Sequence, residues 1–397
     1  MFSSIWGYNH ETILLYIIIV LFTTLFASMS QSKIITGTNN VLPQRVVYRF
    51  PFFISFFILV FFSCTTAVGI DRSAYAQIFR ISSFGNLQNG IEPGYHLLMI
   101  IIKIFTKNEN VFLGIVAFIT VAFVYKGIWD CRHELSIGFA VFIFSSQYYF
   151  QSYNLMRMYF AMSFLIAGVK LLLDGKYLRY LVLILFALCV HYSMIFVLIA
   201  YVISLIFIKI KRVSFDMKFF LSILVVVIFN YFSLSLAINL LGTSNFILDK
   251  YSMYLKETVK SGLGLKWIFN LIPYSLLLPF AKYTNKKQLF LSIAAGYLLV
   301  TLVISIVSYS IPVIGRTLAC LNMPIVIMLP IAFNSFKIKR IIRKASNVVI
   351  RIGMTRIRIS YRVIYLFIYI YYAFAFLLYL DGYVGRDGID NFQFIWN

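Results

Sequence analysis

The chain has 397 residues, of which 61% are hydrophobic and 12% are charged, and its mean hydropathy is +0.90. The charged fraction is about half that of an ordinary soluble domain, which excludes a water-soluble globular enzyme. A net charge of +22, from 35 Lys and Arg against 13 Asp and Glu, would indicate a nucleic-acid partner in a soluble protein. In so apolar a chain the position of the charges matters more, and we expect no nucleic-acid partner.

Apolar runs of about 18 to 22 residues recur from end to end, and roughly 20 residues span the hydrocarbon core of a bilayer. The sequence therefore predicts an all-α polytopic integral membrane protein, with the lipid bilayer as its surroundings and residues 1–397 as a single transmembrane domain. We predict about 12 transmembrane helices. They cover residues 12–29, 50–69, 111–128, 136–151, 157–173, 177–190, 193–209, 218–240, 266–281, 288–308, 313–333 and 363–380.

The apolar piece 95–105 is too short to cross, and we expect a re-entrant or interfacial helix that begins at Pro93. With that choice most Lys and Arg residues fall in one set of loops, which the positive-inside rule makes cytoplasmic. The basic loop 334–362 belongs to this set and suits anionic lipid headgroups. The first outer loop, 70–110 with its interfacial helices, and the second outer loop, 241–266, then face outside with both termini.

The spans are almost free of ionisable groups, since only Lys170 lies well inside one, near its cytoplasmic end. Ion-coupled transporters usually carry charged residues near the membrane midplane, so this pattern argues against one. The ionisable groups of interest lie instead at the outer ends of spans.

Two carboxylates in the first outer loop, Asp71 and Glu92, lie close to the predicted membrane surface. Partial desolvation there can raise a carboxyl pKa toward the working range of a general base. Local structural roles are the alternative: Glu92 can cap the helix that follows it, and Asp71 can pair with Arg72 or Arg80.

Arg157 and Arg316 each begin a span from the outer face. Two arginine forks there can clamp a diphosphate at headgroup level, whereas the alternative is snorkelling without a ligand. His191 lies at the tip between two short spans, where it can act as general base or simply hydrogen-bond to backbone. The loop 241–266, rich in Tyr and Lys, can cover a substrate cavity or be a solvated face.

Four motifs occur in a characteristic order: Gly69-x-Asp71-x-x-x-Tyr75, Glu92-Pro-Gly-Tyr95, Arg157-x-x-x-Ala161-x-Ser163 and Ala187-x-x-x-His191-Tyr-Ser193. Their order and spacing resemble the EpsG family, which is related to the Wzy-type polymerases of O antigen, capsule and exopolysaccharide. The resemblance implies a fold like that of C-type glycosyltransferases. It also implies an enzyme that transfers a growing glycan from undecaprenyl diphosphate to a lipid-linked repeat unit on the outer, periplasmic face of the bacterial inner membrane.

Further expectations follow from this resemblance. The substrate is an undecaprenyl-diphosphate-linked oligosaccharide, and possible partners are a flippase and a chain-length regulator. Because the first outer loop has no DxD pair, we expect neither a metal nor another cofactor. The expected site comprises Asp71, Glu92 and His191 as catalytic candidates with Asp71 favoured as base, Arg157, Arg316 and Arg72 for the diphosphate, and Tyr75, Tyr95, Tyr192 and Ser193 for substrate.

Two other functions compete with a polymerase. A glycosyltransferase that adds one sugar from a polyprenyl-phosphate donor would use the same architecture. A lipid-linked oligosaccharide flippase or transporter would need charged residues along a central cavity, which the spans lack.

Overall fold

The computed structural model describes residues 9–31, 47–84, 91–210, 266–310, 312–342, 347–352, 355–382 and 384–396. The predicted span 218–240 and the outer loop 241–266, except for its last residue, lie outside these ranges. The chain divides into two compact units, residues 1–192 with 326–397 and residues 193–325, which we describe separately.

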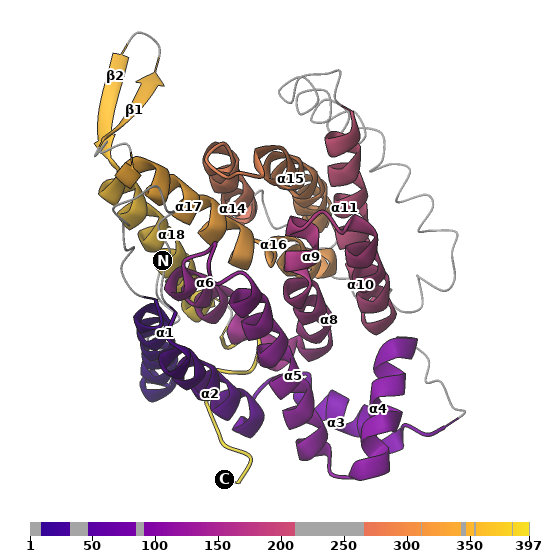
Figure 1. Ribbon diagram of the computed structural model, residues 1–397. Helices are drawn as coiled ribbons and strands as arrows, with labels where there is room; N and C mark the ends of the chain where they lie inside the picture. Colours follow the sequence, from indigo (N-terminus) through magenta and orange to yellow (C-terminus); the bar gives the residue numbers. More distant parts are fainter. Residues whose placement is uncertain are drawn as a thin grey trace. The chain divides into compact units, whose positions relative to one another are not determined.

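The first unit is a bundle of helices with one two-stranded hairpin (Figure 1). In chain order its elements are α1 (His10–Met29), α2 (Arg49–Thr65), α3 (Arg72–Ile81), α4 (Pro93–Phe105), α5 (Glu109–Asp130), α6 (Ile137–Phe144), the π-helical turn η2 (Ser145–Tyr149), α7 (Gln151–Asn154), α8 (Met156–Ala167), α9 (Val169–Leu173), α10 (Tyr177–Val190), α17 (Ile325–Ile342), β1 (Asn347–Ile352), β2 (Thr355–Ser360) and α18 (Tyr361–Gly382). Helix α1 packs on α2 and α6, α2 packs on α5, and α8 packs on both α5 and α10.

Large aromatic side chains fill this unit, and their polar ends bond to backbone or to each other. Tyr149 donates a hydrogen bond to the carbonyl of Leu59 at 2.7 Å, and Tyr153 donates to the Tyr149 hydroxyl at 2.8 Å. Such pairing lets a tyrosine be buried without leaving its hydroxyl unsatisfied. It fastens the η2–α7 segment, just before Arg157, to α2.

The outer faces of several helices are apolar and exposed, as expected where lipid tails replace water. Examples lie on α1, α10 and α18: Leu14, Leu21, Leu25, Leu178, Val182, Leu366 and Phe367. By length and composition, five helices in the described part are apolar enough to cross a membrane, or six if the interrupted segment 315–339 counts as one. The structure thus confirms a helical membrane protein, with the β1–β2 hairpin as an addition, whereas the number of 12 spans stays a prediction.

One end of the first unit collects loops that were predicted to be cytoplasmic. Gln31, after α1, donates through Nε2 to the carbonyls of Arg132 and Leu135, both at 2.9 Å. Asn334 of α17 donates to the carbonyl of Glu134 at 2.8 Å. The end of α1 and the middle of α17 therefore meet at the loop between α5 and α6.

Helix α4 begins and ends at the opposite end of the unit. At its start, Glu92 contacts Arg157 in the first turn of α8. At its end, Lys103 donates to the carbonyl of Arg80 at 2.9 Å, and the Arg80 side chain pairs with Glu109 in the first turn of α5. With 13 residues, α4 runs across this end rather than through the unit, like a re-entrant or interfacial helix.

The predicted basic loop 334–362 contains regular structure that the sequence interpretation missed: α17 continues to Ile342, and the hairpin β1–β2 follows it. It connects α17 to α18 as an antiparallel pair in which Val349 lies opposite Arg358 and Arg351 opposite Arg356 (Figure 1). The alternation of apolar and polar residues in 355–360 has the period of two that a strand needs.

The second unit packs α11 (Met194–Lys209) and α14 (Lys266–Ala281) against α15 (Lys287–Ser310). The 3-10 turn η3 (Pro312–Thr317) and α16 (Leu318–Asn322) close it. Its interior includes Phe207, Ala295 and Leu299. The hydroxyl of Tyr274 donates to the carbonyl of Leu321, which fastens α14 to α16.

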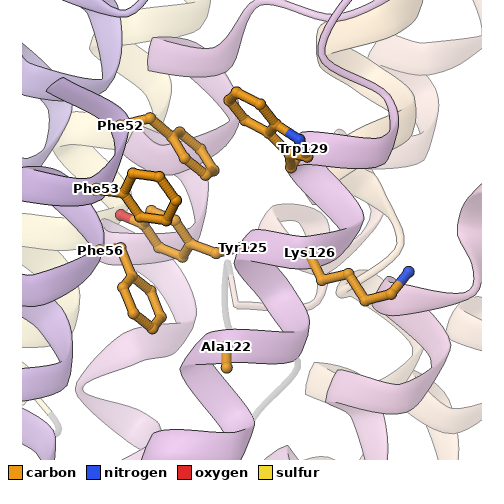
Figure 2. Close-up of a pocket in the computed structure, with 7 residues that line it drawn as sticks. All are labelled: Phe52, Phe53, Phe56, Ala122, Tyr125, Lys126 and Trp129. Atoms are coloured by element: carbon orange, nitrogen blue, oxygen red, sulfur yellow. The ribbon is translucent and has the colours of Figure 1, made fainter. Parts of the chain in front are cut away.

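An aromatic pocket lies between α2 and α5 (Figure 2). Its lining is Phe52, Phe53, Phe56, Ala122, Tyr125, Lys126 and Trp129. The charge of Lys126 is matched, because its Nζ forms an ion pair with Asp130 Oδ2 at 2.5 Å. At about 1.5 Å per helical residue the Trp129 end is roughly 28 Å along α5 from its first turn, so this pocket is separate from the polar cluster described next.

Candidate functional site

The polar cluster of the first unit is built around the carboxylate of Glu92, which is 3% exposed. Its Oε2 accepts a hydrogen bond from Arg157 Nη1 at 2.8 Å, and its Oε1 lies 2.8 Å from His191 Nδ1. The backbone N–H of Tyr192 also points to Oε1, at 3.4 Å. Three segments far apart in the sequence thus converge on one buried carboxylate.

Local backbone features place Glu92 at this point. Pro93 occupies the first turn of α4, where its fixed φ and missing N–H are tolerated, and Glu92 precedes it in extended conformation. Gly94 lets α4 approach the end of α10, because a Cβ there would lie 2.9 Å from the Cys189 carbonyl oxygen. Helix α10 ends at Val190, and His191 follows it in extended conformation beside the start of α4.

Arg157 lies between two tyrosine rings. Its guanidinium carbon is 5.4 Å from the ring centre of Tyr75 and 5.8 Å from that of Tyr95. Both rings are buried, so they form walls for the arginine rather than an exposed stacking surface. Among the described residues no hydrogen-bond partner exists for Arg157 Nε or for the Tyr95 hydroxyl. The cluster therefore retains polar capacity that its own side chains do not use.

Burial alone would raise the pKa of Glu92, but the hydrogen bond from His191 and the charge of Arg157 outweigh it and hold the pKa below its usual 4.5. Glu92 is therefore a carboxylate at neutral pH. Burial raises the pKa of Tyr75 above 10.0, so its hydroxyl is protonated and neutral. A carboxylate only accepts hydrogen bonds, so the hydrogen between His191 and Glu92 lies on Nδ1 of the histidine.

A family model describes the EpsG family and matches residues 49–394, which include this whole cluster. The chain belongs to the EpsG family. No curated protein and no solved structure matches it. Membership indicates a membrane protein resembling the Wzy-type polysaccharide polymerases, and at this level a glycosyltransferase-like enzyme.

Glu92 and Asp71 do not form the local helix cap and the local ion pair with Arg80 that the sequence left open as alternatives. Glu92 precedes α4 but makes no capping hydrogen bond with its side chain, because both oxygens face Arg157 and His191. Arg80 pairs with Glu109, so it is not the partner of Asp71. The interpretations of Glu92 as a helix cap and of Arg80 as the ion-pair partner of Asp71 are therefore wrong.

Asp71 and Arg72 begin α3 beside this cluster. The Asp71 backbone N–H donates to Asn154 Oδ1 at 3.0 Å, and its charge acts on Tyr75 one turn later. Arg72 donates to the neutral side chain of Asn110 at 2.9 Å, and no carboxylate in the described ranges forms an ion pair with it. Arg72 is thus a half-buried cation whose charge is not matched by a neighbouring carboxylate.

The remaining predicted residues differ in their surroundings. Tyr192 is 53% exposed and follows His191. Ser193 and Arg316 belong to the second unit, where Ser193 precedes α11 and Arg316 lies exposed in η3. The structure thus gathers Glu92, Arg157 and His191 directly, whereas the role of Arg316 stays a prediction.

Two polar residues near the cluster were missed by the sequence interpretation. Asn154 is 4% exposed and ends α7, one turn before Arg157. Asp387 lies in the C-terminal tail that follows α18, and its Oδ1 accepts a hydrogen bond from Asn154 Nδ2 at 3.3 Å. Within the described ranges no three His, Cys, Asp or Glu side chains come together as metal ligands. The expectation that the enzyme needs no metal stays a prediction.

Proposed function

We propose that this EpsG-family chain is a polysaccharide polymerase of the bacterial inner membrane. It transfers a growing glycan from undecaprenyl diphosphate to a lipid-linked repeat unit on the periplasmic face. The observation that carries the proposal is that one buried carboxylate, Glu92, contacts both a histidine and an arginine at 2.8 Å. Glycosyl transfer from a lipid diphosphate needs these two functions: a base for a sugar hydroxyl and a cation for developing diphosphate charge.

In this proposal His191 is the base. Both Glu92 oxygens accept hydrogen bonds and the residue is 3% exposed, which makes it a poor proton acceptor for substrate. Its carboxylate instead keeps the hydrogen on Nδ1, so that Nε2 carries the lone pair that can take a proton. Asp71 is the second candidate, because its half-buried carboxylate makes no capping bond to α3.

Arg157 and Arg72 are the proposed ligands of the diphosphate, and they differ in how their charges are matched. The charge of Arg157 is already matched by Glu92, but its Nε and the neighbouring Tyr95 hydroxyl have no described partner and can bind a polar ligand. Arg72 contributes a full positive charge, and its side-chain hydrogen bond in the described part of the chain goes to the neutral amide of Asn110. We assign Arg72 and Arg157 to the diphosphate.

The reaction then balances without another reactant. The acceptor hydroxyl oxygen attacks the anomeric carbon of the donor glycan, and its proton passes to Nε2 of His191. The bond between that carbon and the diphosphate oxygen breaks, and the electron pair leaves with undecaprenyl diphosphate. The positive charges of the arginines stabilise this leaving group. Two partners are proposed in addition: a flippase that delivers the substrate and a chain-length regulator that sets the product length.

The test is polymerisation by the purified full chain in nanodiscs, given synthetic undecaprenyl-diphosphate repeat unit and no nucleotide sugar. A ladder of multimers is expected for the wild type and for Arg80→Ala, an arginine of the first outer loop that is already paired with Glu109. Arg157→Ala and His191→Ala should abolish the ladder while the proteins stay folded.

Other outcomes separate the competing functions. Addition of one sugar from a polyprenyl-phosphate sugar would replace the polymerase with the single-sugar transferase. Movement of the lipid-linked unit across the bilayer with no new glycosidic bond would indicate a flippase. A ladder that survives both substitutions would overturn the site.

A further inference from the structure

The C-terminal tail pairs with the segment that carries Asp71. The backbone N–H groups of Ala67, Gly69 and Ile70 donate to the carbonyls of Gln393, Gly388 and Asp387 at 2.8, 3.0 and 3.1 Å. Further along, the N–H of Ile395 donates to the carbonyl of Thr65 at 2.9 Å. Residues 65–70 are thus held by a segment more than 300 positions later in the sequence.

The tail is itself fixed to the bundle. The Tyr16 hydroxyl of α1 donates to the Ile389 carbonyl at 2.6 Å, and the N–H of Phe392 donates to Thr12 Oγ1 at 3.0 Å. Phe392 also packs edge-on against Tyr16, with ring centres 6.2 Å apart. Residues 387–395 are therefore a fixed strap rather than a loose end.

A chain of side-chain hydrogen bonds connects the strap to the site. Tyr379 donates to Asp387 Oδ2 at 3.1 Å, and Asn154 Nδ2 donates to Asp387 Oδ1 at 3.3 Å. Asn154 Oδ1 in turn accepts the backbone N–H of Asp71 at 3.0 Å. Since Asn154 is buried one turn before Arg157, this chain joins the Asp71 segment to the start of α8.

The backbone of the Asp71 segment adopts this course only because of Gly69. Its φ of +115° is one that other residues rarely adopt, and a Cβ there would lie 2.7 Å from the Tyr153 carbonyl oxygen. The segment is thus pressed against α7 on one side and hydrogen-bonded to the strap on the other. Small displacements of Asn154 or Asp387 will move Asp71 and Arg72 relative to Arg157.

We propose that Asp387 and Asn154 are positioning residues, which hold Asp71 and Arg72 in register with Arg157 for glycosyl transfer. This inference rests on the proposed function for its effect on catalysis. Neither residue touches the reacting atoms in the proposal. Asp387 acts through Asn154, and Asn154 acts through the backbone of Asp71.

The hydrogen bond from the Asn154 amide to the Asp387 carboxylate has a direction, and this provides a test. The amide and the carboxylate can be exchanged between the two positions by mutation. In Asn154→Asp, a second carboxylate faces Asp387 and the donor between them is lost. In Asp387→Asn, the amide oxygen can still accept from Asn154, and its NH₂ can donate to the Tyr379 oxygen. In the double variant, the new carboxylate at position 154 accepts from both the Asp71 N–H and the new amide at position 387, which restores the bonds between the two side chains and to Asp71.

Two readouts on the full chain in nanodiscs test this. The first is hydrogen exchange of the amides of residues 66–75, which needs no substrate, and the second is turnover of the lipid-linked repeat unit. Asn154→Asp should speed exchange at Gly69, Ile70 and Asp71 and lower turnover by about tenfold to a hundredfold, since misplacement by about 1 Å has effects of that size. Asp387→Asn alone should change both by less than about threefold.

The decisive result is the double variant, which should recover exchange and turnover to within about threefold of the wild type. Asn391→Asp is the matched control, because it makes the same replacement in the strap at a side chain that bonds to Asn9 on the surface. A double variant as impaired as Asn154→Asp, or unchanged exchange in Asn154→Asp, would overturn the inference. If the wild type polymerises nothing, the proposed function fails, whereas exchange still decides whether the strap holds the segment.

Discussion

Glu92 and His191 are 99 residues apart in the chain, yet Glu92 Oε1 lies 2.8 Å from His191 Nδ1. The carboxylate orients the imidazole and fixes which nitrogen carries the hydrogen, much as the aspartate does in a Ser-His-Asp triad. The second oxygen of the same carboxylate holds Arg157 at 2.8 Å. One buried group therefore sets the distance between the proposed base and a proposed diphosphate ligand.

Replacing His191 by Asn separates its proposed chemical role from its structural one. The Asn amide can still donate to Glu92, but it has no nitrogen that takes a proton. We expect turnover to fall by about 10² to 10⁴, the usual contribution of a general base. Turnover of the lipid-linked repeat unit and the melting temperature, measured on the same preparation, check this. Turnover within about threefold of the wild type would make Asp71 the better candidate for the base.

The lowered pKa of Glu92 predicts a dependence of stability on pH. Because the folded-state pKa is below 4.5, the carboxylate stabilises the fold fully above its unfolded pKa, and this contribution is lost as pH falls through the folded value. Thermal unfolding in detergent should show it as a loss of stability in acid. Glu92→Gln should lack that part of the acid loss and be less stable at neutral pH by about 1 to 3 kcal/mol. Parallel acid curves for the two proteins would contradict the assignment.

Local features of the fold could be predicted from the sequence. Pro93 begins α4, and the helices before and after His191 have nearly the predicted bounds, at Tyr177–Val190 and Met194–Lys209. Proline fixes a first turn and a break in an apolar run marks a tip, so both signals are contained in a few adjacent residues. The alternation in 355–360 was also present in the sequence but was assigned to a loop.

The partners of the polar residues could not be predicted in the same way. The sequence shows Glu92 before a helix and Asp71 near two arginines, so local capping and local pairing were reasonable alternatives. The actual partners depend on how α4, α8 and α10 pack, which a single sequence does not reveal. Asn154 and Asp387 gave even less signal, because an Asn in an aromatic stretch and an Asp in a Gly-rich tail occur in many loops.

Arg72 and Arg80 lie on the same helix and make a matched pair for the diphosphate proposal. Arg72→Gln removes a half-buried charge that has no described carboxylate partner, so KM for the lipid-linked substrate should rise by about tenfold. Arg80→Gln removes an exposed ion pair with Glu109, which contributes little, and should leave KM within about twofold. Steady-state kinetics over a substrate series measure both. Equal effects of the two substitutions would indicate that general surface charge, rather than Arg72, attracts the substrate.

Gly94 tests whether the close approach of α4 to α10 sets the geometry of the site. A Cβ at this position would lie 2.9 Å from the Cys189 carbonyl oxygen and 3.2 Å from the Val190 nitrogen, both backbone atoms that cannot move by rotating a side chain. Gly94→Ala should therefore push the start of α4 away from His191 and lower turnover by about tenfold or more. Gly114→Ala in α5 is the control, since a Cβ there would make only an ordinary contact, 3.6 Å from the Cys64 carbonyl oxygen of α2. If Gly94→Ala keeps full turnover and the same melting temperature, the distance between Glu92 and His191 does not depend on this approach.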